Sequence, residues 1–234
     1  MLLGAIRMNL PSIFVSGGPM TPGVVKGKRV GLSETFEAVG AYAAGKISDE
    51  ELMEYENNSC PTCGSCSGMY TANSMNCLTE AVGMSMPKNA TCAAVSSERL
   101  RIAKETGERV MELIQENIRP SDILTEKAFR NALACDMALG CSTNTVLHLL
   151  ALAKTAQTNV NMDTVDEMSH KVPQLCKLNP AGHVFIEDLN AFGGIQAVLK
   201  ELARGGYIDD TLLTVTGTVK DRFANAAKPD GTII

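Results

Sequence analysis

Apolar positions along this chain recur mostly at steps of three and four residues, the spacing that gathers side chains on one face of a helix. Together with Ser or Thr residues before several of the apolar runs and glycines after them, the pattern predicts eight helices, in addition to a buried helix in the opening segment "MLLGAIRMNLPSIF". Their expected ranges are 34–45, 49–58, 67–82, 94–118, 126–140, 142–156, 163–172 and 193–206.

The same pattern predicts which helix faces are buried. The helix at 94–118 carries an apolar stripe that we expect to face the core, made up of Leu100, Ala103, Val110, Met111 and Ile114. A shorter stripe in the helix at 34–45 consists of Phe36, Val39 and Ala43. The helix at 142–156 is almost wholly apolar on its inner faces, so we expect it to be central and deeply buried.

Short apolar runs between glycine-rich turns are the strand candidates. They cover residues 13–15, 183–189 and 211–217, and the apolar residues after the turn signal at 228–231 look like the start of another strand. Helices and strands alternate, with helix predominating. The predicted fold class is therefore α/β, a helix-rich layered domain with a small sheet, and one domain covers 1–234 because no repeat or linker interrupts it.

Composition narrows the function classes without changing this picture. The 234 residues are 45% hydrophobic and 20% charged with a net charge of -5, which is ordinary for a soluble globular protein. No apolar run approaches the ~18 residues that a membrane-spanning helix needs. The charge balance argues against nucleic acid or an anionic membrane surface as the main partner. No signal-peptide cleavage site follows the apolar start, so we expect a cytoplasmic protein.

Eight cysteines are the most distinctive feature of the composition. In a reducing compartment they are not expected to form disulfides. Three of them, Cys60, Cys63 and Cys66, have CxxCxxC spacing in the segment "CPTCGSCSGMYTANSMNC". We expect the other five to be small buried apolar residues: Cys77, Cys92, Cys135, Cys141 and Cys176.

The CxxCxxC spacing is compatible with several kinds of site, each incomplete. A structural zinc site normally uses two close ligand pairs, and no second CxxC exists. A bacterial ferredoxin cluster needs a fourth cysteine where Tyr70 stands. A thioredoxin-type pair follows a strand, whereas the preceding segment is polar and helix-like. In a site assembled from distant segments, Cys66 is the best-placed ligand, because it immediately precedes an expected helix start, where amides and dipole favour a thiolate.

At this point the sequence resembles a known family. Four segments carry the resemblance, in this order: "IFVSGGPM", "CPTCGSCSGMYTANSMNCLTEAVG", "STNTVLHLLALA" and "RGGYIDDTLLTVTG". They look like the dihydroxy-acid/phosphogluconate dehydratase family of iron-sulfur hydro-lyases, over about residues 1–217. Within the family, the cysteine segment is similar to the members that dehydrate 2,3-dihydroxy-3-methyl acids in valine and isoleucine biosynthesis.

The resemblance implies a β-elimination that turns a 2,3-dihydroxy acid into a 2-keto acid. It implies two cofactors, an iron-sulfur cluster (2Fe-2S or 4Fe-4S) with one open iron that acts on the C3 hydroxyl, and Mg²⁺ that holds the carboxylate and C2 hydroxyl. The expected partner is the small-molecule dihydroxy acid, and the full-length enzyme is expected to be a homodimer. In this family the cysteine before the SGM-type segment is a cluster ligand, and here it is Cys66.

The resemblance also implies that other parts of the site lie outside the sequence. The family's first two cluster cysteines would precede Met1, the second of them in a Cys-Asp-Lys segment that also binds magnesium. A further magnesium-binding glutamate and the serine base belong to a C-terminal β-barrel domain that would follow Ile234. We therefore expect residues 1–234 to be a single partial α/β domain, most of the family's N-terminal domain, that is inactive alone and carries no catalytic base.

Ser142, Thr143 and Asn144 are the candidate substrate-binding residues. They stand at an expected helix start, where amides and hydroxyls can meet a carboxylate, although an ordinary N-cap is the simpler explanation. The glycines of "SGGPM" (16–20) could also line the site.

Two alternative functions remain open. The first is a fragment of a sugar-acid or phosphogluconate dehydratase. The second is a non-catalytic protein with a zinc knuckle at Cys60, Cys63 and Cys66.

Overall fold

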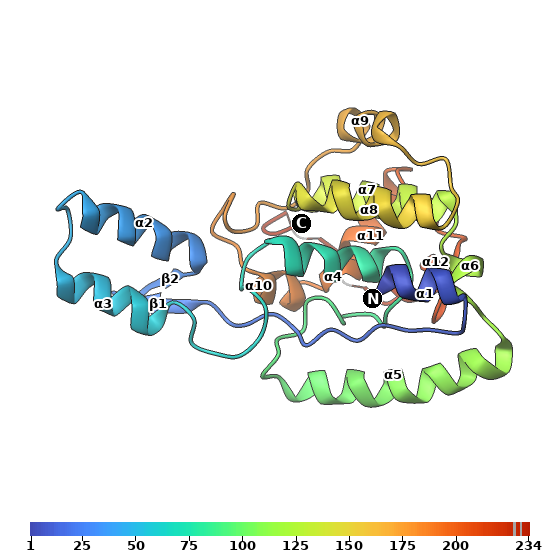
Figure 1. Cartoon of the computed structure of the whole chain (residues 1–234), viewed down its shortest axis with the longest axis horizontal. Helices are drawn as coiled ribbons and strands as arrows, with labels where there is room; N and C mark the ends of the chain where they lie inside the picture. Colours follow the sequence, from blue (N-terminus) through green and yellow to red (C-terminus); the bar gives the residue numbers. More distant parts are fainter. Residues whose placement is uncertain (227, 230) are drawn as a thin grey trace.

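The structure, a computed structural model, describes residues 1–226, 228–229 and 231–234. These residues form twelve helices and two small two-stranded antiparallel sheets (Figure 1). The helices are α1 (Leu2–Met8), α2 (Leu32–Ala43), α3 (Asp49–Asn58), α4 (Thr71–Ala81), α5 (Ser97–Glu116), α6 (Pro120–Ile123), α7 (Glu126–Leu139), α8 (Asn144–Thr155), α9 (Met162–Lys171), α10 (Ile186–Ala191), α11 (Gly194–Arg204) and α12 (Val219–Phe223). The strands are β1 (Gly23–Val25), β2 (Lys28–Val30), β3 (Leu213–Thr214) and β4 (Gly217–Thr218). The prediction of a helix-rich fold with little sheet is confirmed.

The helices are arranged as a body with a smaller lobe at one end. In Figure 1 the lobe, at the left, contains α2, α3 and the β1–β2 hairpin, while α4, α7, α8 and α11 stack in the body. Helix α5 runs along the lower edge of the body and α9 lies above it. Among the described residues, no helix combines the length and apolarity that a membrane crossing requires.

Helix α7 is the centre of the core and packs against α4, α8, α9 and α11. It begins after Thr125, whose hydroxyl accepts a hydrogen bond from the Ala128 amide at 3.3 Å, and it ends at Gly140 in the left-handed conformation. Phe129 and Leu133 are fully buried, each contributing about 1.5–3 kcal/mol of apolar burial. The helix predicted over 126–140 is confirmed.

Helix α8, predicted to be the central buried helix, packs against α1, α4 and α7 and leaves another face open. Its buried face consists of Thr145, Leu149, Leu152 and Ala153. Leu147 is 67% exposed, so the expectation of deep burial is wrong. An apolar composition on several faces does not show which neighbours will cover them, and here α1, α4 and α7 together leave Leu147 uncovered.

Two predicted core stripes are also wrong, because both face away from the body. In α5 the buried positions are Arg99, Ile102, Thr106 and Leu113. The predicted stripe of this helix is exposed except for a half-buried Val110. In α2 the buried residue is Ala38, while Phe36 is 65% exposed. Helical periodicity identified both helices, but not the side on which each is anchored.

The sheet predictions are confirmed only in part. Residues 213–214 within the predicted 211–217 form β3, whereas 13–15 makes no more than an isolated bridge from Phe14 to Ser85. The run at 183–189 is helical from Ile186 onward, because the Asp188 carboxylate accepts a hydrogen bond from the Phe185 amide at 2.8 Å and caps α10. Residues 231–234 are described and form no strand, and Asp230 lies outside the described residues.

Candidate functional site

The cysteine-rich segment is a loop between α3 and α4. Cys60 and Cys63 are exposed and Cys66 is half-buried, all as free thiols. Helix α4 begins at Thr71, so the helix start predicted at residue 67 is wrong. The reason is that backbone groups before Thr71 are bonded elsewhere: the Ser67 carbonyl accepts from the Ile186 amide at 2.9 Å, which leaves no continuous helical turn there.

The segment 16–20 supports one side of this loop, which places "SGGPM" beside Cys66. The Ser65 amide donates to the Gly18 carbonyl at 2.9 Å, and the Met20 amide donates to the Ser65 carbonyl at 2.7 Å. Gly64 has φ +129°, and a Cβ there would lie 2.6 Å from the Met20 amide nitrogen. Glycine is therefore required at position 64 both for the backbone conformation and for the close approach.

Asn73, fully buried on the first turn of α4, fixes the loop from the helix side. Its side-chain nitrogen donates to the carbonyls of Cys66 and, at 2.7 Å, Gly68. Its side-chain oxygen accepts from the Ser65 hydroxyl at 2.6 Å. One amide thus satisfies polar groups on both sides of Cys66, which determines where the thiol lies.

Asn179 fixes the opposite side of the loop and ties it to the lobe. Its backbone carbonyl accepts from the Met69 amide at 2.7 Å, and a Cβ on Gly68 would lie 2.6 Å from that same oxygen. Its side-chain nitrogen donates to the Glu34 carboxylate at 2.9 Å. Burial raises the pKa of Glu34. Hydrogen bonds from the Gly31 amide and other donors, Asn179 among them, together lower it by more, so the net pKa is below its ordinary value.

The environment of the Cys66 thiol differs from the predicted one. Burial is the main cause that raises the pKa of Cys66, and the neighbouring Cys60 raises it slightly further. Because α4 begins at Thr71, five positions beyond Cys66, the amides of its first turn and its dipole do not act directly on the thiol. A positively charged group bound to the sulfur would favour the thiolate instead.

Ser142 and Asn144 lie against the start of α4, a contact that their positions in the sequence did not predict. The Ser142 hydroxyl lies 3.2 Å from the Thr71 hydroxyl, and the Asn144 side-chain nitrogen donates to the same Thr71 oxygen at 2.8 Å. The Ser142 amide donates to the Ser74 hydroxyl at 3.0 Å. Thr143 occupies the N-cap position of α8 without a side-chain capping bond, while the Ser142 hydroxyl accepts a hydrogen bond from the Asn144 amide at 3.4 Å, as a capping residue does.

The turn at Ser142 is held from behind by a buried carboxylate. The Thr145 hydroxyl donates to Asp136 at 2.8 Å and also lies 2.7 Å from the Ser142 carbonyl. Burial raises the pKa of Asp136 from 3.8 to about 6, against the opposing effect of the Thr145 bond. Asp136 therefore links the end of α7 to the start of α8.

The starts of α4 and α8 consequently meet at Thr71 and Asn144. The positive ends of the two helix dipoles lie together there, which is an arrangement suited to a carboxylate. Tyr70 precedes Thr71, and its hydroxyl is buried and has no hydrogen-bond partner among the described residues. Tyr70, Asn73 and Asn179 were not predicted as site residues, because buried polar groups have no period in a sequence.

The other cysteines match their prediction as packing residues. Cys77, Cys92, Cys135 and Cys176 are buried, and Cys141 is half-buried. Burial raises the pKa of Cys176 to about 12 and that of Cys77 and Cys135 well above the usual range of a thiol. These thiols stay protonated near neutral pH, so they are poor metal ligands and poor nucleophiles.

The positions of the possible ligand side chains can be compared with the metal sites expected from the sequence. Within the described part of the chain, no three His, Cys, Asp or Glu side chains gather as ligands for one ion. Cys60, Cys63 and Cys66 are thus not gathered there as the ligand set of a zinc knuckle. Cys66 fits a different role, because a half-buried thiol on a loop fixed from both sides is suited to give one ligand to a group held jointly with other residues.

Comparison with known proteins identifies the class to which this fold and loop belong. A sequence model described as the dihydroxy-acid/6-phosphogluconate dehydratase N-terminal region matches residues 1–222. The chain therefore belongs to the dihydroxy-acid/6-phosphogluconate dehydratase family.

Individual relatives within the family carry the name dihydroxy-acid dehydratase. The protein of that name from Lachnoclostridium phytofermentans is 57% identical over 231 residues, which are 98% of this chain and 42% of the relative. The one from Carboxydothermus hydrogenoformans is 58% identical over 235 residues, covering 100% of this chain and 42% of the relative. The chain thus spans about two fifths of the length of the curated relatives it matches.

Proposed function

We propose that this chain forms part of a dihydroxy-acid dehydratase, a hydro-lyase that converts a 2,3-dihydroxy acid into a 2-keto acid. The observation that carries the proposal is identity of 57–58% along essentially the whole chain with proteins of that name. We place the reaction in branched-chain amino-acid biosynthesis and in the cytoplasm.

In this proposal Cys66 is the chain's ligand to an iron-sulfur cluster. When bound, the cluster would supply an open iron as a Lewis acid at the C3 hydroxyl, and Mg²⁺ would hold the substrate's carboxylate and C2 hydroxyl. The chain's own contribution is position: Asn73 and the bridge from Gly18 to Ser65 hold the loop, so the thiol has a defined place before anything binds.

The starts of α4 and α8 are the proposed contact for the substrate carboxylate. Ser142, Thr143 and Asn144 contribute hydroxyl and amide groups there, and Thr71 and Tyr70 lie beside them. Support comes from the two converging helix ends and from the unpartnered Tyr70 hydroxyl. These residues would orient the acid and stabilise its charge without taking its proton.

The reaction itself is balanced as an elimination. A base removes the C2 proton, the C3–O bond breaks, the oxygen leaves as water after protonation, and the resulting enol becomes the 2-keto acid by moving a proton to C3. No base is assigned to residues of this chain. Asp136 is excluded from that role, because its carboxylate is buried and serves the Ser142 turn through Thr145.

A chimera tests the proposal. The segment of the Carboxydothermus hydrogenoformans dihydroxy-acid dehydratase that matches this chain is replaced by this chain, and turnover is measured with 2,3-dihydroxyisovalerate, gluconate and 6-phosphogluconate after anaerobic reconstitution. We expect 2-keto acid formation from 2,3-dihydroxyisovalerate. A folded chimera that dehydrates only the sugar acids would replace the proposal by a sugar-acid dehydratase. A folded, cluster-loaded chimera with no turnover on any of them would contradict the proposal.

A further inference from the structure

Glu80, in the last turn of α4, is a fully buried residue whose carboxylate holds the backbone on both sides of Asn89. It accepts hydrogen bonds from the Lys88 amide at 3.0 Å and from the Ala90 amide at 2.9 Å. The Gln196 side chain of α11 donates to the same carboxylate at 2.7 Å. Lys88 has φ +66°, a left-handed conformation that residues other than glycine rarely adopt. The bond to Glu80 therefore maintains a turn that the chain would not favour by itself.

Arg222, on α12, binds the end of α4 close to the same carboxylate. Its guanidinium donates to the Glu80 carbonyl and to the Ser85 carbonyl, both at 3.0 Å. The pKa of Glu80 lies above its ordinary value, because burial outweighs the charge of Arg222 and the hydrogen bonds to the carboxylate. Three separate parts of the chain thus meet at Glu80: residues 85–90, α11 and α12.

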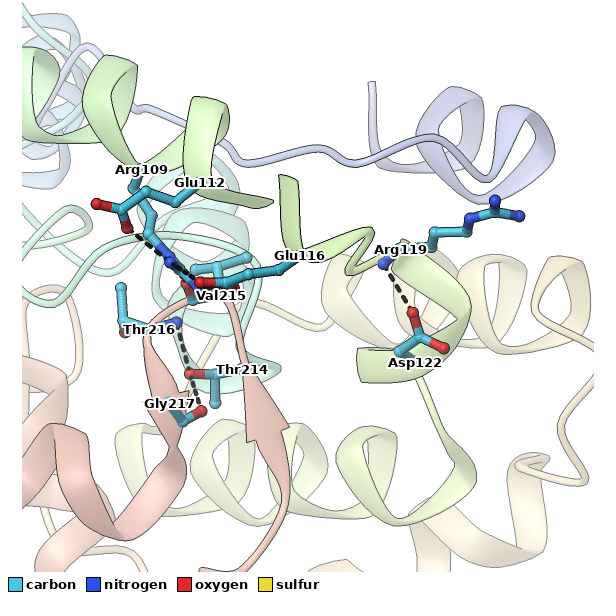
Figure 2. Close-up of polar contacts among 9 residues, drawn as sticks. All are labelled: Arg109, Glu112, Glu116, Arg119, Asp122, Thr214, Val215, Thr216 and Gly217. Carbon is cyan, nitrogen blue, oxygen red and sulfur yellow. Dashed lines mark hydrogen bonds and ion pairs between the residues drawn. The ribbon is translucent and has the colours of Figure 1, made fainter. Parts of the chain in front are cut away.

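The end of α4 is also fixed by the β3–β4 hairpin. The Val215 amide, beside β3, donates to the Gly83 carbonyl at 2.9 Å, and the Arg109 Nε of α5 donates to the Val215 carbonyl at 2.5 Å. Figure 2 shows that the Arg109 guanidinium is paired in addition with Glu112 at 2.6 Å and with Glu116 at 2.7 Å. The hairpin is therefore anchored between α5 and the end of α4, which gives the helix end a defined place.

The loop after α4 supports the segment 14–19. The Ser16 amide donates to the buried Asn89 side-chain oxygen at 2.9 Å. Gly18 has φ +91°, and a Cβ there would lie 2.7 Å from the Cys92 carbonyl oxygen. Two backbone bonds join the same parts of the chain, from the Phe14 amide to the Met84 carbonyl and from the Ala94 amide to the Pro19 carbonyl, both at 2.9 Å. The segment 14–19 therefore depends on the loop that Glu80 holds.

The contacts continue from Gly18 to the cysteine loop. The Gly18 carbonyl accepts hydrogen bonds from the Ser65 amide at 2.9 Å and from the Ser65 hydroxyl at 3.2 Å. Ser65 is the neighbour of Cys66 in the sequence. An unbroken series of contacts thus joins Glu80, through Asn89 and Gly18, to the residue beside the Cys66 thiol.

We infer that Glu80 is a positioning residue for the Cys66 thiol, acting through Asn89 and the segment 16–20. Asn73 bonds the loop on the side of α4, and Glu80 holds the support on the side of residues 16–20. Loss of the carboxylate would release the turn at residue 88, and the support of the loop would loosen on that side. The inference rests on the proposed function only for the role of Cys66 as a cluster ligand.

Glu80→Gln is the test variant, and the rate of alkylation of Cys66 by iodoacetamide, followed by mass spectrometry, is the measurement. Glutamine keeps the shape of the side chain, but its NH₂ group replaces one of the two oxygens that accept from residues 88 and 90. We expect alkylation of Cys66 to become at least about 5-fold faster, as the loss of one buried hydrogen bond would allow.

The other cysteines serve as internal references in the same sample. Cys60 and Cys63 are already exposed, so they should react at the rate of the parent. Cys135, fully buried on α7, should stay unreacted, because only unfolding of the body would expose it. Alkylation of Cys66 and Cys135 together would show global unfolding and would overturn the inference.

A second variant tests the route by which Glu80 acts, and it carries the test by itself if Glu80→Gln does not fold. Asn89→Ala removes the acceptor of the Ser16 amide and should also accelerate alkylation of Cys66. Because both changes act on one series of contacts, the double variant should react no faster than the faster single variant. Rates that multiply in the double variant would contradict a route through Asn89.

Asp122→Asn is the matched control. Its carboxylate accepts a hydrogen bond from the Arg119 amide at 2.8 Å, outside the series of contacts that leads to Cys66 (Figure 2). We expect this variant to alkylate Cys66 at the rate of the parent. An unchanged Cys66 rate in folded Glu80→Gln, or an equal acceleration in Asp122→Asn, would overturn the inference. The measurement uses neither cluster nor turnover, so a failure of the proposed function would leave its result standing.

Discussion

The side-chain amide of Asn73 donates a hydrogen bond to the backbone carbonyl of Cys66, across the turn that joins the cysteine loop to α4. The same amide nitrogen bonds Gly68, and its oxygen accepts from Ser65, so three loop residues depend on one buried side chain. The place of the Cys66 thiol is therefore encoded by the helix that follows it.

Replacing Asn73 by Ala is expected to release the loop. The change leaves the carbonyls of Cys66 and Gly68 without a donor, which costs about 1–3 kcal/mol of unfolding free energy. Urea denaturation measures this cost. Alkylation of Cys66, followed by mass spectrometry, should also become faster because the loop opens.

Asn76→Ala, on the same helix and half-buried, is the control for helix propensity. It is expected to change the unfolding free energy by less than the Asn73 variant and to leave alkylation of Cys66 unaltered. Equal effects of the two variants would show that Asn73 does not hold the loop.

Gly64→Ala is expected to disrupt the contact between the cysteine loop and residues 16–20. The new Cβ would lie 2.6 Å from the Met20 amide nitrogen, in addition to its strain at φ +129°. Gly27→Ala provides the comparison, since it has φ +74° with nothing within 4 Å of the new Cβ. The urea midpoint should fall further for Gly64→Ala by an amount equivalent to about 1 kcal/mol or more. Equal midpoints would refute the close approach.

Arg99→Lys is expected to loosen α5. A lysine ammonium cannot reach all the acceptors that the guanidinium serves, namely the carbonyls of Ser16 and Cys92 and the Asn89 side chain. We expect a loss of about 1–3 kcal/mol in unfolding free energy and faster amide exchange along α5. Arg101→Lys, on the exposed side of the same helix, should be nearly neutral, and an equal loss there would argue against the anchor.

Asp136 should make the stability of the chain pH-dependent in a specified direction. Its pKa is about 6 in the folded chain and 3.8 ordinarily, so between these pH values the folded state binds the extra proton. Stability from this group is therefore present at low pH and lost as the pH rises through about 6, by roughly 3 kcal/mol. Asp136→Asn removes this dependence while keeping an oxygen for Thr145.

The measurement is the unfolding free energy of both proteins between pH 4 and pH 7.5. The unfolding free energy of the Asp136→Asn variant should increase relative to that of the parent as the pH rises, with most of the change between pH 4 and pH 6. If the unfolding free energies of the two proteins changed in parallel with pH, folding would not raise the pKa of Asp136, and this account of the carboxylate would be contradicted.

Sequence patterns predicted most helices because local signals determine where a helix begins and ends. Thr125 and Gly140 mark the ends of α7, and Ser48 with Glu51 forms the capping box that starts α3. The same patterns failed on which face is buried. In α5 the inward face is chosen by Arg99 and by its bonds to residues 16, 89 and 92, and such long-range partners leave no period in the sequence.

The site was predictable to a similar degree. Cys66 could be selected because its segment resembles a family, and Asn144 because it stands at an expected helix start. The structure places both beside the start of α4. Their supports, Asn73 and Asn179, could not be selected, because a buried amide is distinguished only by the groups around it. The helix start predicted at residue 67 failed for the same reason, since Met69 bonds to Asn179 instead of continuing a helix.

The central claim is that Cys66, and not its neighbours, holds the cluster in the assembled enzyme. In the chimera described above, iron content, the visible spectrum and turnover of 2,3-dihydroxyisovalerate are compared for Cys60→Ser, Cys63→Ser and Cys66→Ser after anaerobic reconstitution. We expect cluster and turnover to be lost with Cys66→Ser alone, while the two exposed neighbours tolerate the change. Retention of the full cluster and full turnover in the Cys66→Ser chimera would contradict the claim.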